Sequence, residues 1–318
     1  MEISKIRDTA AQLRENISKV IVGKTEIINL MITALLSNGH ILLEDVPGTG
    51  KTMLAKALAR SMAADFKRIQ FTPDLLPSDI TGLNYYNQKL GEFTFHSGPI
   101  FTNILLADEI NRATPRTQSS LLECMEERQI TIDGETHLLE QPFLVIATQN
   151  PVETSGTFPL PEAQLDRFLL QLRIGFPTVR EELDILNRFM TDSPLETLSP
   201  VCSGEELLLM QQGCKSVFVH PSLMEYMAAI SRQTREQDAI ALGVSPRGTL
   251  ALLRTSQAYA ALQGLSYVTP EIIQFLTPYV FTHRLILRSS FHKASSAGEL
   301  MTRILSEIAV PTEDFSRS

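Results

Sequence analysis

The 318-residue sequence has little cysteine and no long apolar run, and these two absences narrow the class of protein. Its three cysteines, Cys124, Cys202 and Cys214, form no Cys-x-x-Cys pair, so a disulfide framework is not expected and a reducing compartment fits best. No apolar run approaches the roughly 18 residues of a membrane-spanning helix. Residues 1–16 carry charges throughout, which predicts no signal peptide. We therefore expect a cytoplasmic protein without a membrane span.

The sequence also lacks the excess of positive charge that a general nucleic-acid binder usually carries. Its formal net charge is −8 and its pI is about 5.4. The six histidines do not have the spacing of metal ligands. At about 100–200 residues per domain, the length suggests two domains. Nucleic acid is therefore not favoured as a partner.

The first part of the chain alternates between short apolar runs and segments with helical periodicity. Five segments are read as strands: 40–44, 66–71, 105–108, 143–148 and 169–174. Residues 40–44, 105–108 and 143–148 are apolar runs, and the first is read as a buried strand. Helices are expected between them and before the first, at 2–18, 24–37 and 51–63. Strands that alternate with helices predict an α/β fold, in which a parallel sheet is covered by helices on both faces.

Two segments break this alternation and predict β-hairpins. Residues 83–95 are aromatic and polar around Gly91. Residues 128–140 contain an Asp133-Gly134 turn between two alternating segments, which is a strong hairpin signal. Both are read as inserts in the α/β domain.

After Phe176-Pro177 the sequence becomes predominantly helical. Five helices are expected, at 178–190, 205–214, 221–235, 246–263 and 270–282. Several begin with proline in the first turn, where its missing N–H is not needed. These features predict an α/β domain over 1–176 and an all-helical second domain over 177–318.

The loop after the first strand has the composition of a phosphate loop. Its glycines allow backbone N–H groups to wrap a polyphosphate, Lys51 would contact the β/γ-phosphates, and the Thr52 hydroxyl would bind Mg²⁺. Asp45 stands where the usual pattern has glycine, but an apolar strand precedes the loop and a helix follows it. We therefore expect ATP to contact Pro47, Gly48, Thr49, Gly50, Lys51, Thr52 and Met53.

The apolar segment that begins at residue 104 ends in two carboxylates, Asp108 and Glu109. Asp108 would hold Mg²⁺ through its waters, and Glu109 would polarise the water that attacks the γ-phosphate. Asn150 follows the next apolar run, so a neighbouring parallel strand would place its amide beside the pair, where it could position that water. The other reading of Asn150 is a turn residue before Pro151.

Together these residues resemble the AAA+ ATPases, and within them the MoxR family. The resemblance covers residues 20–287, and its most specific stretches are 96–101, 104–128, 242–247 and 267–271. It implies a P-loop NTPase sheet with two hairpin inserts that line or face a pore, and a helical lid. It also implies a homo-oligomeric ring, expected to be hexameric, with ATP at the subunit interface.

The resemblance implies roles for three further side chains. Asn150 is similar to the residue called sensor 1. Arg167 is similar to the arginine finger, which would stabilise charge on the γ-phosphate bound by the neighbouring subunit. Arg247 is similar to the sensor 2 arginine, which would couple the lid to the nucleotide state. The alternatives are a surface ion pair for Arg167 and a helix start for Arg247.

Five more positions have a counterpart in the family or lie near the acidic pair. Val22 and Gly23 match the loop that contacts adenine. Gln70 is similar to a residue that holds the catalytic glutamate inactive until a partner binds. Arg112 and Arg116 follow the acidic pair, and either could lie at the subunit interface.

The resemblance also implies a chaperone-like activity. Such a ring would remodel or mature client protein complexes, together with a separate protein that carries a von Willebrand factor A domain. A ring motor acting on nucleic acid would need cations on its hairpins, and these hold one lysine, Lys89, beside acidic residues. The third possibility is a scaffold that binds nucleotide without hydrolysing it, which the presence of Glu109, Asn150 and Arg167 does not favour.

Overall fold

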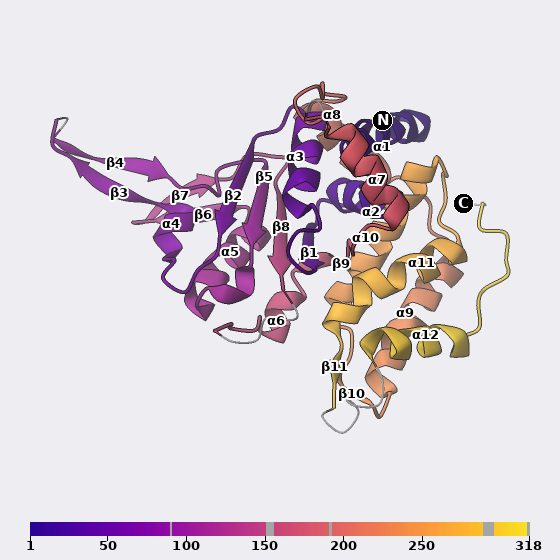
Figure 1. The fold of residues 1–318 in the computed structure, drawn as a ribbon. Coiled ribbons are helices and arrows are strands. Elements are labelled where there is room, and N and C mark those ends of the chain that lie inside the picture. Colours follow the sequence, from indigo (N-terminus) through magenta and orange to yellow (C-terminus); the bar gives the residue numbers. More distant parts are fainter. Residues whose placement is uncertain (90, 151–155, 191–192, 289–295, 317–318) are drawn as a thin grey trace.

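A five-stranded parallel sheet forms the centre of the α/β part of the chain (Figure 1). The computed structural model describes residues 1–89, 91–150, 156–190, 193–288 and 296–316. The strands of the sheet are β1 (His40–Glu44), β2 (Phe66–Gln70), β5 (Ile104–Asp108), β8 (Leu144–Gln149) and β9 (Phe168–Leu172), in the order β2-β5-β8-β1-β9. The predicted parallel sheet is confirmed. Its order places the ends of β5, β8 and β1 side by side at one edge.

Side chains of the sheet divide between two hydrophobic cores, because successive residues of a strand point to opposite faces. Ile41 and Leu43 pack into one core with the helices α1 (Ile3–Ser18), α2 (Thr25–Leu36) and α3 (Lys51–Ser61). Leu42 packs into the other core with α4 (Pro77–Thr81), the 3-10 helix η1 (Ile110–Arg112) and α5 (Pro115–Glu127). Covering both faces buries most residues of β1, β5 and β8, whereas the edge strand β2 is largely exposed.

Two antiparallel hairpins leave the sheet, as predicted. One consists of β3 (Gly82–Asn87) and β4 (Glu92–Ser97) and projects furthest from the body of the molecule (Figure 1); the other consists of β6 (Gln129–Ile132) and β7 (Glu135–Leu138). The two hairpins contact each other. Phe95 stacks on His137 with ring centroids 4.2 Å apart, and the Asn84 amide donates to Asp133 Oδ2 at 2.9 Å.

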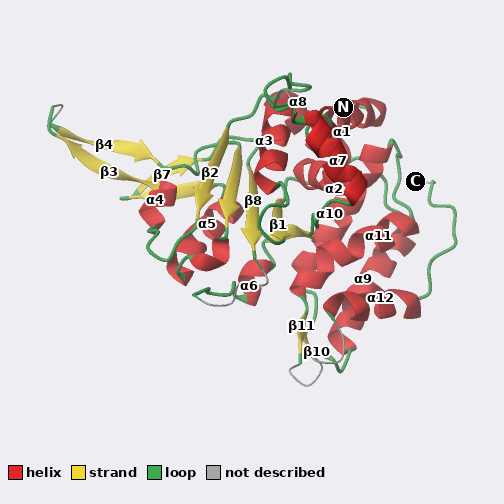
Figure 2. Ribbon diagram, in the orientation of Figure 1, coloured by secondary structure: helices red, strands yellow, loops and turns green. Residues whose placement is uncertain are grey.

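Helices dominate the chain after the short helix α6 (Glu162–Leu165) and strand β9 (Figure 2). The expected five are present as α7 (Val179–Arg188), α8 (Gly204–Cys214), α9 (Pro221–Glu236), α10 (Pro246–Gln263) and α11 (Pro270–Phe281). The structure adds the 3-10 helix η2 (Thr282–Arg284) and the helix α12 (Ala297–Glu307). It also adds an antiparallel pair, β10 (Ile240–Leu242) with β11 (Ile286–Leu287), so the lid is helical but not entirely so.

Helices α1 and α2 connect the sheet to the lid. Both pack against α10, and their apolar side chains share one continuous core with α9 and α11. The domain boundary at Pro177 stays a prediction. Over the residues that the structure describes, no helix has the length and apolar character needed to cross a membrane.

Candidate functional site

The loop between β1 and α3 has the backbone that a phosphate loop requires. Gly48 and Gly50 have φ angles of 85° and 86°, a left-handed conformation that favours glycine. Helix α3 begins at Lys51, so the N–H groups of its first turn are directed at the loop. The Lys51 ammonium donates to the carbonyl oxygens of Asp45 and Val46 at 3.1 and 3.2 Å, which holds it within the loop.

Asp45, the departure from the usual phosphate-loop pattern, ties the loop to the segment after β9. Its Oδ2 accepts from the backbone N–H groups of Ile174 and Gly175, both at 2.8 Å, and its Oδ1 accepts from Val46 N at 2.9 Å. The side chain is buried, so these three donors replace the water that the carboxylate loses. The sequence marks Asp45 as unusual but does not reveal these partners.

A cavity of about 200 Å³ opens beside the phosphate loop. It is lined by five of the predicted nucleotide contacts: Val22, Gly48, Thr49, Gly50 and Met53. Gly23 lies next to it, where an added Cβ would overlap the Glu181 side chain of α7. Ile185 and Phe189 form an apolar wall of the cavity. Sequence analysis did not predict that Ile185 and Phe189 line a cavity. The available signal was that the two residues are four positions apart and therefore share one face of the predicted helix.

The two carboxylates at the end of β5, Asp108 and Glu109, are organised by Thr148, on the neighbouring strand β8. The Thr148 hydroxyl donates to Asp108 Oδ1 at 2.6 Å and accepts from Glu109 N at 2.8 Å. Glu109 has a φ of 56°, which is strained for a residue with a side chain and is typical of functional sites. Thr148 was not identified from the sequence. Its position two residues before Asn150, in a strand parallel to β5, was the available signal.

Two side chains of the edge strand β2 hold the same carboxylates. Arg68 donates to Asp108 Oδ2 from Nη2 at 2.7 Å and from Nε at 3.2 Å. Gln70 Nε2 donates to Glu109 Oε2 at 2.7 Å, so the predicted contact between Gln70 and the acidic pair is present. Arg112 also pairs with Glu109 Oε2, at 2.9 Å within the same chain.

Asn150 directly follows β8, which lies between β5 and β1. Its neighbour Gln149 accepts a hydrogen bond from Asp45 N at 3.1 Å, so the backbone at Asn150 lies between the acidic pair and the phosphate loop. This is the position that sequence analysis assigned to it. Its action on a water molecule stays a prediction.

Arg167 and Arg247 lie at the opposite end of β1 from the phosphate loop. Arg167 immediately precedes β9, whose first residue is aligned with His40 at the start of β1. At roughly 3.3 Å per residue, His40 and Asp45 are about 16 Å apart. Arg247, in the first turn of α10, shares a carboxylate with Arg167 and does not line the cavity beside the phosphate loop. The lid helix that borders that cavity is α7.

The two arginines line a second cavity, of about 600 Å³, which has a strongly positive wall. Five arginines and two carboxylates contribute to it: Arg128, Arg167, Arg247, Arg254, Arg284, Glu126 and Asp166. His40 adds no charge at neutral pH, because burial lowers its pKa from 6.5 to about 3. An excess of three positive charges here, in a chain of net charge −8, favours an anionic ligand.

Comparisons with known proteins agree with this architecture. Residues 40–170 match the family described as "ATPase family associated with various cellular activities (AAA)", and residues 232–304 match the AAA lid domain. The chain is 52% identical to the Bacillus subtilis protein YeaC over 94% of both chains. It is 39% identical to Chaperone MoxR1 of Mycobacterium tuberculosis, over 93% of this chain and 80% of that protein. The chain belongs to the MoxR family of AAA+ ATPases.

Further relatives support this assignment to the MoxR family. Protein MoxR of Methylorubrum extorquens is 28% identical over 96% of both chains. The crystal structure of a candidate ATPase from Cytophaga hutchinsonii superposes with a TM-score of 0.91 and 36% identity, over 98% of this chain and 97% of that one. The family resemblance predicted from the sequence is confirmed, and with it a nucleotide-binding chain of the ATPase class.

Proposed function

We propose that this MoxR-family chain hydrolyses ATP with Mg²⁺ in a closed ring of identical subunits, expected to be hexameric. The observation that carries the proposal is the separation of two half-sites along β1. The phosphate loop and the acidic pair lie at one end, and Arg167 with Arg247 lies at the other. Neither half suffices for AAA+ chemistry, but the loop of one copy and the arginines of the next complement each other.

The residues beside the phosphate loop fit ATP and Mg²⁺. The left-handed glycines and the start of α3 offer N–H groups to phosphates, and the apolar cavity accepts a flat base next to them. Asp108 and Thr52 supply a carboxylate and a hydroxyl, which are ligands that Mg²⁺ prefers. Among the described residues no cluster of three or more His, Cys, Asp and Glu exists, so phosphates and water would complete the coordination.

Each catalytic side chain then has one role. Glu109 accepts the proton of the attacking water, Asn150 orients that water, and Arg167 of the neighbouring copy stabilises negative charge on the transferring phosphoryl group. Gln70 and Arg112 occupy Glu109 Oε2 and so keep Glu109 from accepting the proton of the water, until the nucleotide or a partner rearranges them. Arg247 acts on the neighbour's nucleotide with Arg167, because its own phosphate loop is out of reach.

Exposed apolar side chains on α7 support contact between subunits beside the nucleotide. Val179, Leu183 and Leu186 are 76%, 56% and 67% exposed, on a helix whose Ile185 lines the nucleotide cavity. A contiguous apolar patch of this kind is typical of a protein interface.

Phosphate release measured across a series of protein concentrations tests the proposal. We expect specific activity to rise with concentration as subunits associate, and then to reach a plateau. A specific activity that is independent of concentration from the monomeric to the assembled range would contradict a shared site. A wild-type ring that binds ATP but releases no phosphate would favour the scaffold instead.

Mg²⁺ binding should become tighter when Arg68 is replaced by Met. The Arg68 guanidinium occupies Asp108 Oδ2 and so competes with the metal and its waters. Arg68 is 46% exposed, and such ion pairs contribute about 0.2–1 kcal/mol, so the half-saturating Mg²⁺ concentration should fall by up to about fivefold.

Lys67→Met is the matched control, because it removes the same charge from the neighbouring position of β2. Titration of ATPase activity with Mg²⁺ gives the comparison. If the Arg68→Met and Lys67→Met curves coincide, Arg68 does not compete with the metal.

We further propose that the ring acts as a chaperone on client protein complexes, together with a von Willebrand factor A domain protein. Support comes from the relative named Chaperone MoxR1 and from the projecting hairpin, where Tyr86 and Phe93 are 54% and 73% exposed. Co-purification of such a partner with a tagged Glu109→Gln chain tests the proposal. Recovery that is the same with and without ATP would count against it.

The charge of the hairpins does not favour the nucleic-acid motor, because residues 82–97 and 129–138 contain one lysine, Lys89, and no arginine. We place the ring in the cytoplasm. The three cysteines are buried free thiols, which suits a reducing compartment.

A further inference from the structure

One carboxylate bridges the two arginines that the proposed function assigns to the neighbouring site. Glu126, in the last turn of α5, accepts from Arg247 Nη1 through Oε1 at 2.9 Å and pairs with Arg167 Nε through Oε2 at 3.3 Å. Arg167 also donates from Nη1 to the carbonyl of Leu122, at 2.7 Å. Each guanidinium has five N–H donors, so these contacts leave others on both arginines for a phosphate.

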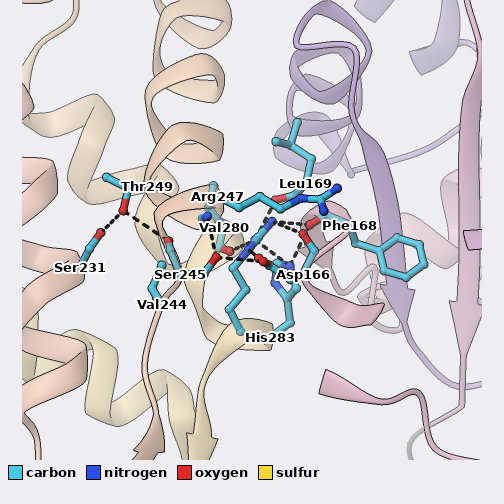
Figure 3. Close-up of polar contacts among 12 residues, drawn as sticks. Asp166, Phe168, Leu169, Ser231, Val244, Ser245, Arg247, Thr249, Val280 and His283 are labelled. Atoms are coloured by element: carbon cyan, nitrogen blue, oxygen red, sulfur yellow. Dashed lines mark hydrogen bonds and ion pairs between the residues drawn. The ribbon is translucent and has the colours of Figure 1, made fainter. Parts of the chain in front are cut away.

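The backbones that carry these arginines are joined by a second network, which Figure 3 shows. Asp166, next to Arg167, accepts at Oδ2 from the hydroxyl of Ser245, the N-cap of α10 and two residues before Arg247, at 2.9 Å. Its Oδ1 accepts from Arg284 Nε at 2.7 Å. The start of β9 and the start of α10 therefore share one carboxylate.

Arg284 adds further hydrogen bonds to this connection between the start of β9 and the start of α10. It is buried, and besides Asp166 it donates to the backbone carbonyls of Phe168, at 2.6 Å, and Leu169, at 3.3 Å. His283 contacts the Phe168 carbonyl through Nε2 at 3.0 Å, and burial keeps its pKa well below 6.5, so it adds no competing charge. These hydrogen bonds connect the backbone beside Arg167 to the backbone beside Arg247, so what remains to be positioned is the two long side chains.

We propose that Glu126 is a positioning residue that holds the Arg167 and Arg247 side chains as one preformed pair, ready for the nucleotide of the neighbouring subunit. The inference rests on the proposed function, because it needs both arginines to act between copies. Ordering the two side chains before the nucleotide arrives lowers the entropy that must be lost in the transition state. Glu126 itself contacts no nucleotide in this arrangement.

Glu126→Gln tests the bridge with a side chain of the same size. In the amide, a donor NH₂ group replaces one of the two carboxylate oxygens, so one of the two guanidinium groups faces a donor in place of its acceptor, and the negative charge is lost. We expect kcat to fall about tenfold, which is well short of the roughly 10³-fold loss expected without the finger itself. The KM for ATP should stay within about twofold, because the nucleotide pocket at the other end of β1 is unchanged.

Glu127→Gln is the matched control. It removes the same charge from an exposed residue in the same helical turn and should keep the wild-type kcat. Glu126→Asp keeps both oxygens on a shorter side chain and should recover part of the loss. Thermal unfolding and gel filtration of each variant verify folding and assembly.

A mixing experiment then tells whether Glu126→Gln impairs the arginines offered to the neighbouring subunit or the nucleotide site of its own chain. A Lys51→Ala chain lacks its own phosphate contact but supplies intact arginines, so adding it to Glu126→Gln should restore activity per Glu126→Gln chain. The proposal is overturned if Glu126→Gln matches Glu127→Gln, if the variant no longer assembles, or if mixing restores nothing. If Arg167→Ala keeps full activity in the same assay, the proposed function fails instead.

Discussion

Glu109→Gln should lower kcat for ATP hydrolysis by about 10²–10⁴-fold while ATP stays bound. The amide cannot accept the proton of the attacking water, whereas the phosphate loop, Lys51 and the apolar cavity are untouched. The hydrogen bond from Glu109 N to the Thr148 hydroxyl does not involve the Glu109 side chain, so the left-handed backbone conformation at residue 109 should persist in the variant. Phosphate release measures kcat, and equilibrium titration with a fluorescent ATP analogue measures binding.

Glu123→Gln, on the exposed side of α5, is the control for the loss of one negative charge. If Glu109→Gln hydrolyses ATP at a rate within a few-fold of the wild type, another residue activates the water. If both hydrolysis and binding vanish, the side chain has a structural role that the hydrogen bonds do not reveal.

Arg167→Ala should lower kcat by about 10³-fold or more, in line with the loss of an arginine finger, with less effect on ATP binding. Because the loss lies in the neighbour's site, it should be rescued by subunits that cannot bind nucleotide. We therefore expect mixtures of Arg167→Ala and Lys51→Ala chains to be more active than either alone, as measured by phosphate release at constant total protein.

Arg232→Ala provides the control, because Arg232 forms an exposed ion pair with Glu236 on α9 and lines neither the cavity beside the phosphate loop nor the cavity at Arg167 and Arg247. It should neither lose activity nor need rescue. Additive activities in the Arg167→Ala and Lys51→Ala mixtures, with no gain, would place the arginine on its own subunit's nucleotide.

The sequence predicts the fold and the glycine-containing loop between β1 and α3, because both are encoded locally; phosphate binding by that loop stays a prediction. The strands β1, β5 and β8 each contain an apolar run, and the loop from Pro47 to Thr52 carries its glycines, lysine and hydroxyl within six residues. The turn at Asp133-Gly134 is local too. The strands β10 and β11 consist of three and two residues, too short for alternation to be recognised.

The contacts around the arginines could not be predicted, since their partners are remote in the sequence. Arg284 meets Asp166 across 118 positions, and Arg247 meets Glu126 across 121. Sequence analysis recognised Arg247 by its resemblance to a lid arginine, but only the fold shows that it lies beside Arg167. Arg68 illustrates an intermediate case. It shares a strand face with Gln70, yet its pairing with Asp108 depends on the register of β2 and β5.

The separation of the two half-sites along β1 has a consequence for how many chains can work at once. If every site needs a loop from one copy and arginines from the next, the contact is head-to-tail, and an open row of n copies holds only n − 1 complete sites. In a pair of chains, one of the two phosphate loops would therefore have no arginines opposite it. Only when the last copy meets the first does every loop gain its arginines, so closure itself becomes an activating step.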